Sequence, residues 1–143
     1  MNGSDDESVR ILGIDPGEKR LGLAISDPLG VTAQGLDTFI AGQGVEFIDY
    51  LCGLISRYNI EVVVLGMPLS MGGDRIEGTE RSRRLAERIR EECRVEVVLR
   101  DERMTSLEAE RVMKQEGRIR DPGDIDRMAA VLLLQGYLDE REG

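Results

Sequence analysis

The 143-residue chain contains no histidine and no tryptophan, and it has two cysteines. Without histidine, catalysis by a Ser-His-Asp or Cys-His arrangement is excluded, and so is a metal site with imidazole ligands. Cys52 and Cys93 lack the CxxC spacing and lie in apolar helical contexts, so we predict neither a zinc site nor a disulfide framework. Any chemistry must use carboxylates, arginines, hydroxyls, backbone groups or a metal with oxygen ligands.

Aromatic side chains and long apolar runs are also scarce. Aromatic residues make up 3% of the chain, so stacking of bases on rings cannot be the main way of binding nucleic acid. No apolar run is long enough to cross a membrane. The polar and acidic start, MNGSDDESVR, lacks the pattern of a signal or transit peptide. We therefore expect a short disordered lead-in over residues 1–8 and a cytoplasmic location.

The charge balance is acidic, with a net charge of −9. This charge argues against attraction of nucleic acid to the whole surface, although it permits a local basic face. It also suits a site that gathers carboxylates around a divalent cation, because Mg²⁺ prefers hard oxygen ligands. An apolar fraction of 41% and this length fit one globular domain, which we place at residues 9–143.

The first half of the chain has the pattern of three strands followed by a helix. Apolar runs predict strands at residues 9–15 and 21–26, with a third strand within residues 31–39. Apolar side chains then recur at helical spacing over residues 45–58. The three strands are expected to form a β-meander.

Strands and helices alternate in the second half. The pattern predicts a buried strand at 60–68, a glycine-rich loop at 70–78 and a helix at 80–93. A strand at 95–100 follows, and a Thr105–Glu108 capping box opens the next helix. A loop at 116–124 then leads to a last helix at 125–138. Such alternation implies an α/β fold, a mixed five-stranded sheet in which the meander is followed by βαβ units and helices cover both faces.

Four acidic residues fall where ligands gather in such a sheet, at the carboxyl ends of strands or at a helix start. Asp15 follows the first strand, and Asp101 and Glu102 follow the last. Asp126 shares one face of the last helix with the small, apolar Ala129. A carboxylate at the edge of a core needs a partner, and a metal ion shared by these acids would supply one.

Each acid also has a simpler interpretation. Asp15 precedes Pro-Gly and has the position of a turn residue. Asp101 and Glu102 fit a solvated surface run, and Asp126 fits a first-turn acid that complements the helix dipole. The residues alone leave these alternatives open, although the acids together favour a metal site.

Four motifs resemble the YqgF/RuvX family of RNase H-like proteins. They are LGIDPGEKRLGLAISDPLGVTAQGL, VVLGMPLSMGG, VVLRDERMTSLEAERVM and DIDRMAAVLLLQGYL, and the resemblance covers nearly all of residues 11–138. It implies an RNase H-like fold in which Asp15, Asp101 or Glu102, and Asp126 bind a divalent metal.

The chain departs from that family at two places. The loop after GMPL often reads Asn-Met-Asp-Gly in the family, but it reads Ser-Met-Gly-Gly over residues 70–73 here and runs on into a longer DRIEG segment. RuvC-type relatives also carry an acid on the fourth strand, whereas this strand ends in Gly-Met-Pro at residues 66–68. The acid of a later strand must therefore come from the DER motif.

With these residues, the mechanism that fits is hydrolysis of a phosphodiester by water activated by Mg²⁺ or Mn²⁺. Lys19 and Arg20, on the turn beyond Asp15, are candidates for holding the backbone of a nucleic acid, as is Arg103. Turns also carry such residues for solubility alone. The arginine row on the helix at 80–93 is interpreted as a solvated face.

The resemblance implies two activities, processing of pre-16S rRNA in ribosome biogenesis and resolution of Holliday junctions. A chain that is acidic and poor in aromatics favours a substrate presented by a larger particle, so we predict a nuclease for the 5′ end of pre-16S rRNA and keep junction resolution as the alternative. Two further alternatives are an ATP-binding domain of the actin and sugar-kinase type and a non-catalytic RNase H-like binding module. A monomer and a homodimer both fit the sequence.

Overall fold

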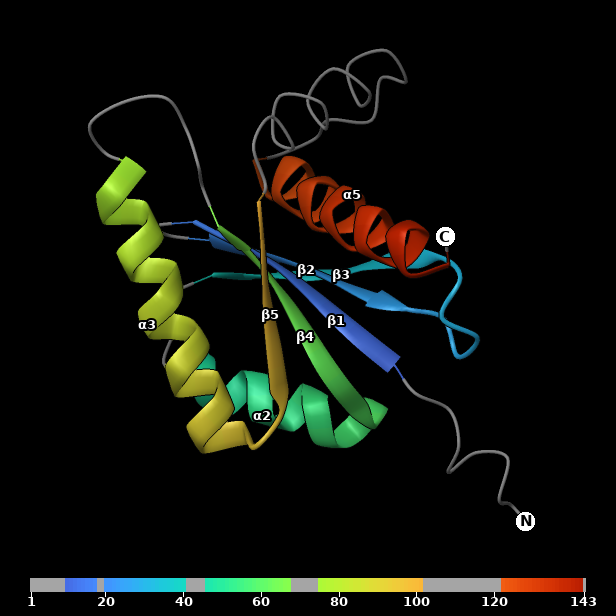
Figure 1. The fold of residues 1–143 in the computed structure, drawn as a ribbon, viewed down its shortest axis with the longest axis horizontal. Coiled ribbons are helices and arrows are strands. Elements are labelled where there is room, and N and C mark those ends of the chain that lie inside the picture. Colours follow the sequence, from blue (N-terminus) through green and yellow to red (C-terminus); the bar gives the residue numbers. More distant parts are fainter. Residues whose placement is uncertain (1–9, 18–19, 41–45, 68–74, 102–121, 143) are drawn as a thin grey trace.

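The computed structural model describes residues 10–17, 20–40, 46–67, 75–101 and 122–142 (Figure 1). The elements along the chain are β1 (Arg10–Pro16), β2 (Arg20–Ser26), β3 (Ala33–Ile40), α2 (Phe47–Tyr58), β4 (Ile60–Met67), α3 (Arg75–Cys93), β5 (Glu96–Asp101) and α5 (Pro122–Glu142). The lead-in expected at residues 1–8 and the helix expected after Thr105 lie outside the described residues. No described helix is long and apolar enough to span a membrane.

The strands form one five-stranded sheet in the order β3-β2-β1-β4-β5. β1, β2 and β3 pair antiparallel as a meander, whereas β4 pairs parallel with both β1 and β5. This topology confirms the predicted mixed sheet. Because β1, β4 and β5 run in one direction, their carboxyl ends meet at the same edge of the sheet, which we call the carboxyl edge.

Helices cover both faces of the sheet (Figure 1). α2 and α3 lie on one face, where Leu12 and Ile14 of β1 join an apolar cluster with Ile89 of α3. α5 lies on the other face, where Ile11 of β1 packs with Leu134. The alternation along β1 therefore puts Ile11, Gly13 and Asp15 toward α5, since successive strand side chains point to opposite faces.

Two helices begin earlier than the sequence pattern predicts. α3 begins at Arg75 and not near residue 80, and α5 begins at Pro122 and not near residue 125. One glycine inside a helix costs about 1 kcal/mol, so Gly78 does not stop α3. Proline is well tolerated in the first turn of a helix, where its missing N–H has no intrahelical partner, so Pro122 opens α5 and does not belong to a loop.

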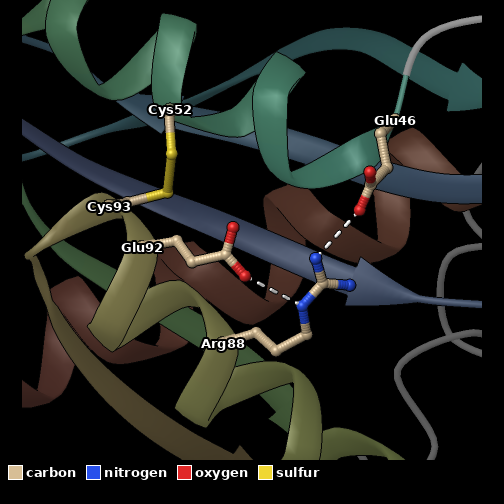
Figure 2. The surroundings of a disulfide bond; sticks show 5 residues. All are labelled: Glu46, Cys52, Arg88, Glu92 and Cys93. Atoms are coloured by element: carbon tan, nitrogen blue, oxygen red, sulfur yellow. Dashed lines mark hydrogen bonds and ion pairs between the residues drawn. A yellow bond between two sulfur atoms is a disulfide. The ribbon is translucent and has the colours of Figure 1, made fainter.

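A disulfide joins Cys52 of α2 to Cys93, the last residue of α3 (Figure 2). Beside it, Arg88 of α3 forms ion pairs with Glu46 at the start of α2 and with Glu92 (Figure 2). The prediction that these cysteines form no disulfide is therefore wrong. The two cysteines are 41 positions apart in the sequence. Their pairing depends on how two helices pack, so no local spacing of cysteines predicts it.

Replacing both cysteines by serine is expected to lower the free energy of unfolding by about 2–4 kcal/mol, because the closed loop restricts the unfolded chain. Urea unfolding of the native chain and of the C52S/C93S variant, each with and without dithiothreitol, measures the difference. Reductant should shift the native midpoint toward that of the variant and leave the variant unchanged. Coincident curves for the oxidised native chain and the variant would contradict a stabilising cross-link.

Two glycines let α5 lie directly on β1 and β2. A Cβ built on Gly13 would stand 2.9 Å from the Cβ of Leu134, closer than such atoms normally approach. A Cβ on Gly22 would overlap the backbone carbonyl oxygen of Asp126. The absence of side chains at these positions therefore sets both the height of α5 above the sheet and the place of its first turns.

We expect Gly22→Ala to destabilise the fold by about 1–3 kcal/mol, the usual cost of forcing an extra methyl into a close contact. Gly53→Ala is the matched control, because a Cβ on Gly53 meets nothing within 4 Å and lies inside α2. That control should stabilise the chain by about 0.5–1 kcal/mol, since alanine is the better helix former. Thermal unfolding compares the three proteins, and an unchanged midpoint for Gly22→Ala would show that α5 is not held by this contact.

Candidate functional site

Asp15 lies near the end of β1 and faces α5. At 6% exposed, it is the one charged residue that is buried in the described part of the chain. In the antiparallel ladder it stands opposite Gly22 of β2. The strand end, the burial and the orientation toward α5 agree poorly with the interpretation of Asp15 as a simple solvated turn residue.

Asp126 lies over the same glycine. Its backbone carbonyl approaches the Cα of Gly22 so closely that a Cβ would not fit. Asp15 and Asp126 thus border one residue, Asp15 from the neighbouring strand and Asp126 from the helix above. The structure brings these two predicted acids, which are 111 positions apart in the sequence (126 − 15), to the same corner of the carboxyl edge.

The early start of α5 also bears on the alternative proposed for Asp126. Because the helix begins at Pro122, the acid in its first turn is Asp124. Asp126 lies beyond that turn, where the helix dipole acts weakly on a side chain. The position complementary to the dipole is therefore held by another residue, and the carboxylate of Asp126 has a different environment.

That environment contains Arg20, the first residue of β2. Its Nε donates a hydrogen bond of 2.7 Å to Oδ2 of Asp126. The Arg20 side chain is 39% exposed and that of Asp126 is 23% exposed, so the pair lies at the border between core and solvent. Arg20 shares the α5 face of β2 with Gly22 and Ala24, as strand alternation requires. Sequence reasoning assigned Arg20 to phosphate contact and missed this ion pair.

Arg127 and Asp124 hold the start of α5 on the edge strand. Nε of Arg127 donates to the carbonyl oxygen of Leu36 on β3 at 2.9 Å. Nη1 of Arg127 lies 3.5 Å from Oδ1 of Asp124, one turn earlier in the helix. The two arginines near Asp126 therefore have different partners: Arg127 binds β3 and Asp124, whereas Arg20 binds Asp126.

The other predicted site residues are only partly described. The backbone of Asp101 pairs with Met67 at the end of β4, so the carboxyl end of β5 lies at the same carboxyl edge. The Asp101 side chain, Glu102, Lys19 and Arg103 lie outside the described residues. Within the described ranges, no group of three acidic or cysteine side chains is close enough to hold a metal ion. Asp15 and Asp126 are therefore the described part of the predicted site.

The donor set fits a hard divalent cation. Two carboxylates from two different elements border one corner, one of them buried, and Mg²⁺ and Mn²⁺ prefer such oxygen ligands. Arg20 supplies a positive charge at the same corner. Carboxylates for a metal with an arginine beside them form a pattern that suits binding and hydrolysis of a phosphate ester.

Comparison with known proteins gives close relatives over the whole length. A protein of Lactobacillus gasseri is 42% identical over 137 residues, which cover 92% of this chain and 96% of that protein. A protein of Bacillus cytotoxicus is 41% identical over 137 residues, covering 93% and 100%. One from Dictyoglomus turgidum is 42% identical over 140 residues, covering 92% and 94%. All three carry the name "Putative pre-16S rRNA nuclease".

Solved structures share the fold at low sequence identity. Thermus thermophilus RuvC in complex with a Holliday junction substrate superposes with a TM-score of 0.59 at 17% identity, covering 94% of this chain and 96% of that one. The fowlpox virus Holliday junction resolvase gives a TM-score of 0.55 at 17% identity, covering 92% and 99%. At this identity the likeness establishes the RNase H-like fold alone.

A family profile described as "RuvX: Holliday junction resolvase" matches residues 9–140, nearly the whole chain. The relatives above agree with that match, since each is about 40% identical over almost the full length of both proteins. The motifs around Asp15 and Asp126, which border one corner of the sheet in the structure, both lie within the matched residues. The protein belongs to the RuvX family.

Proposed function

We propose that this protein is a metal-dependent nuclease that hydrolyses phosphodiester bonds at the 5′ end of pre-16S rRNA. The observation that carries the proposal is the placement of Asp15 and Asp126 beside Gly22, at the carboxyl edge where a mixed sheet of this kind gathers its ligands. The names of its full-length relatives support the same activity and the same substrate.

Asp15 and Asp126 would hold Mg²⁺ or Mn²⁺ together with one acid of the DER motif. A metal held there would lower the pKa of an attacking water and would stabilise the leaving oxygen. The residues of the chain supply the rest. Asp15 is fixed by its buried place in the ladder, and Asp126 is fixed by the contact of α5 with Gly22. Lys19 and Arg103 would contact the phosphate backbone of the substrate.

Between the two acids of the DER motif, we propose Glu102 as the ligand. Val97 and Leu99 of β5 pack in the cluster under α2 and α3. Arg100 faces the opposite way, because its Nη1 and Nη2 pair with Glu140 of α5. Since strand side chains alternate, position 100 shares the α5 face used by Asp15, and Glu102 would share it if the alternation continued beyond Asp101, the last described residue of β5.

The substrate follows from charge and composition. With a net charge of −9 and few aromatic residues, the chain should bind free nucleic acid weakly and in a salt-sensitive way. A ribosomal precursor particle in the cytoplasm presents its RNA end at high local concentration, and the particle therefore suits this protein better than a free junction found by charge attraction. Junction resolution, which the family description names, is the competing outcome of the tests below.

Asp15→Asn should lower turnover by more than about a hundredfold while the fold stays intact, because it removes charge from a ligand and keeps its shape. Glu102→Gln should be equally damaging, and Asp101→Asn is the matched control expected to retain most activity. Cleavage of a precursor RNA in Mg²⁺ measures all three, and EDTA should abolish the native activity. Undiminished cleavage by Asp15→Asn would end the metal-dependent mechanism, and the reverse ranking of Asp101 and Glu102 would reassign the third ligand.

Cells depleted of the protein should accumulate 16S precursor with an uncut 5′ end, and expression of the native chain should restore the mature end. The Asp15→Asn variant is the control, because it should be produced at normal levels without restoring processing. Mapping of 16S 5′ ends by primer extension gives the measurement. Normal ends in depleted cells, together with symmetric cutting of four-way DNA junctions by the purified protein, would favour junction resolution over rRNA processing.

A further inference from the structure

The strongest unexplained feature of the site is that one proposed metal ligand is already paired with a cation. Nε of Arg20 lies 2.7 Å from Oδ2 of Asp126. This contact joins residues 106 positions apart and links the start of β2 to α5 at the corner that also contains Asp15. The guanidinium occupies one oxygen of this carboxylate and would place a positive charge beside a divalent cation bound to the same group, so the two cations repel each other.

The neighbouring charges do not offer Arg20 or Asp126 an equivalent partner among the described residues. Arg127, the next residue on α5, donates to the carbonyl oxygen of Leu36 and lies near Asp124. Asp15 stands opposite Gly22, two residues along the ladder from Arg20, and has interactions of its own. Among the described residues, the positive charge paired with Asp126 is therefore that of Arg20.

We propose that Arg20 is an internal counter-cation of the site, which holds Asp126 until a divalent metal binds and then leaves that carboxylate. The inference rests on the proposed metal-dependent function and adds a competition between the metal and one residue of the chain. Two carboxylates at one corner repel each other when no metal is present, so an adjacent arginine stabilises the metal-free protein. The same arginine must then lower the affinity of the site for metal.

The position of Arg20 allows this exchange. Its side chain is 39% exposed and begins at the first residue of β2, so the guanidinium can turn toward solvent without disturbing the core. A guanidinium released beside the metal presents parallel N–H donors that match two oxygens of a phosphate. Arg20 would thus neutralise Asp126 in the empty site and contact the substrate backbone in the loaded site.

Calorimetric titration of Mn²⁺ into the protein without nucleic acid tests the competition. Arg20→Gln should bind Mn²⁺ about two- to fivefold more tightly than the native chain, the gain expected when a partly exposed ion pair no longer has to break. Arg20→Lys, which keeps the charge, should stay close to native. Equal or weaker binding by Arg20→Gln, with a native circular dichroism spectrum, overturns the proposal.

Two control variants separate a direct contact from a general charge effect. Arg127→Gln removes the cation next to Asp126 in the sequence but keeps the ion pair between Arg20 and Asp126. Arg88→Gln removes a remote cation that pairs with Glu46 and Glu92. Both should bind Mn²⁺ as the native chain does. Tightening by Arg127→Gln as large as that by Arg20→Gln would overturn a specific competition for Asp126.

A spectroscopic measurement follows Arg20 itself. In ¹⁵N NMR spectra, the Nε–H signal of Arg20, assigned by its loss in Arg20→Gln, should move toward the position of a solvated arginine when Mg²⁺ is added. The Nε–H signal of Arg88 should not move. A signal that stays in place at saturating Mg²⁺ overturns the release of Arg20.

The two proposals fail in different ways. If the native chain binds no Mn²⁺, or binds it no better than Asp15→Asn does, the metal-dependent function falls and the counter-cation falls with it. If Asp15→Asn loses binding but Arg20→Gln does not gain it, the metal site stands and only the role given to Arg20 is wrong.

Discussion

The close contact between the first turns of α5 and Gly22 of β2 is the constraint on which the site depends. It is a backbone contact, since the carbonyl oxygen of Asp126 occupies the space that a side chain on Gly22 would fill. Gly13 repeats the arrangement further along α5, against Leu134. Because β1 and β2 carry glycine at these points, α5 can pack close to the sheet. This close packing brings Asp126, near the end of the chain, to the same corner as Asp15, near its beginning.

The charges of that corner follow from this closeness. A helix packed at the usual height would leave Asp126 in solvent, where its carboxylate would need no particular partner. Here its side chain is 23% exposed and accepts from Arg20, while Asp15 is buried on the adjacent strand. Burial makes the negative charge costly unless a cation is near. The same geometry that suits a divalent metal therefore also explains why the chain keeps an arginine at this place.

The opposite face of the sheet is held by different means. There, α2 and α3 pack over Leu12 and Ile14 and are tied to each other by the disulfide and by the ion pairs of Arg88. Ser82 of α3 also donates to the carbonyl oxygen of Gly66 near the end of β4, at 3.3 Å. The Ser82 contact holds α3 near the carboxyl end of β4, whereas Cys93 lies just before the start of β5, at the opposite edge of the sheet.

The sequence by itself determined the strands, most of each described helix, the mixed sheet and the face of β1 that carries Asp15, because these depend on apolar periodicity over neighbouring residues. It also singled out Asp15 and Asp126 as candidates. Only the tertiary structure decided that the two acids border Gly22, that Arg20 pairs with Asp126 and that Cys52 is bonded to Cys93. The disulfide joins residues 41 positions apart and the ion pair joins residues 106 positions apart. Such contacts, like that of Asp126 with Gly22, are set by how the helices lie on the sheet, which no local pattern encodes.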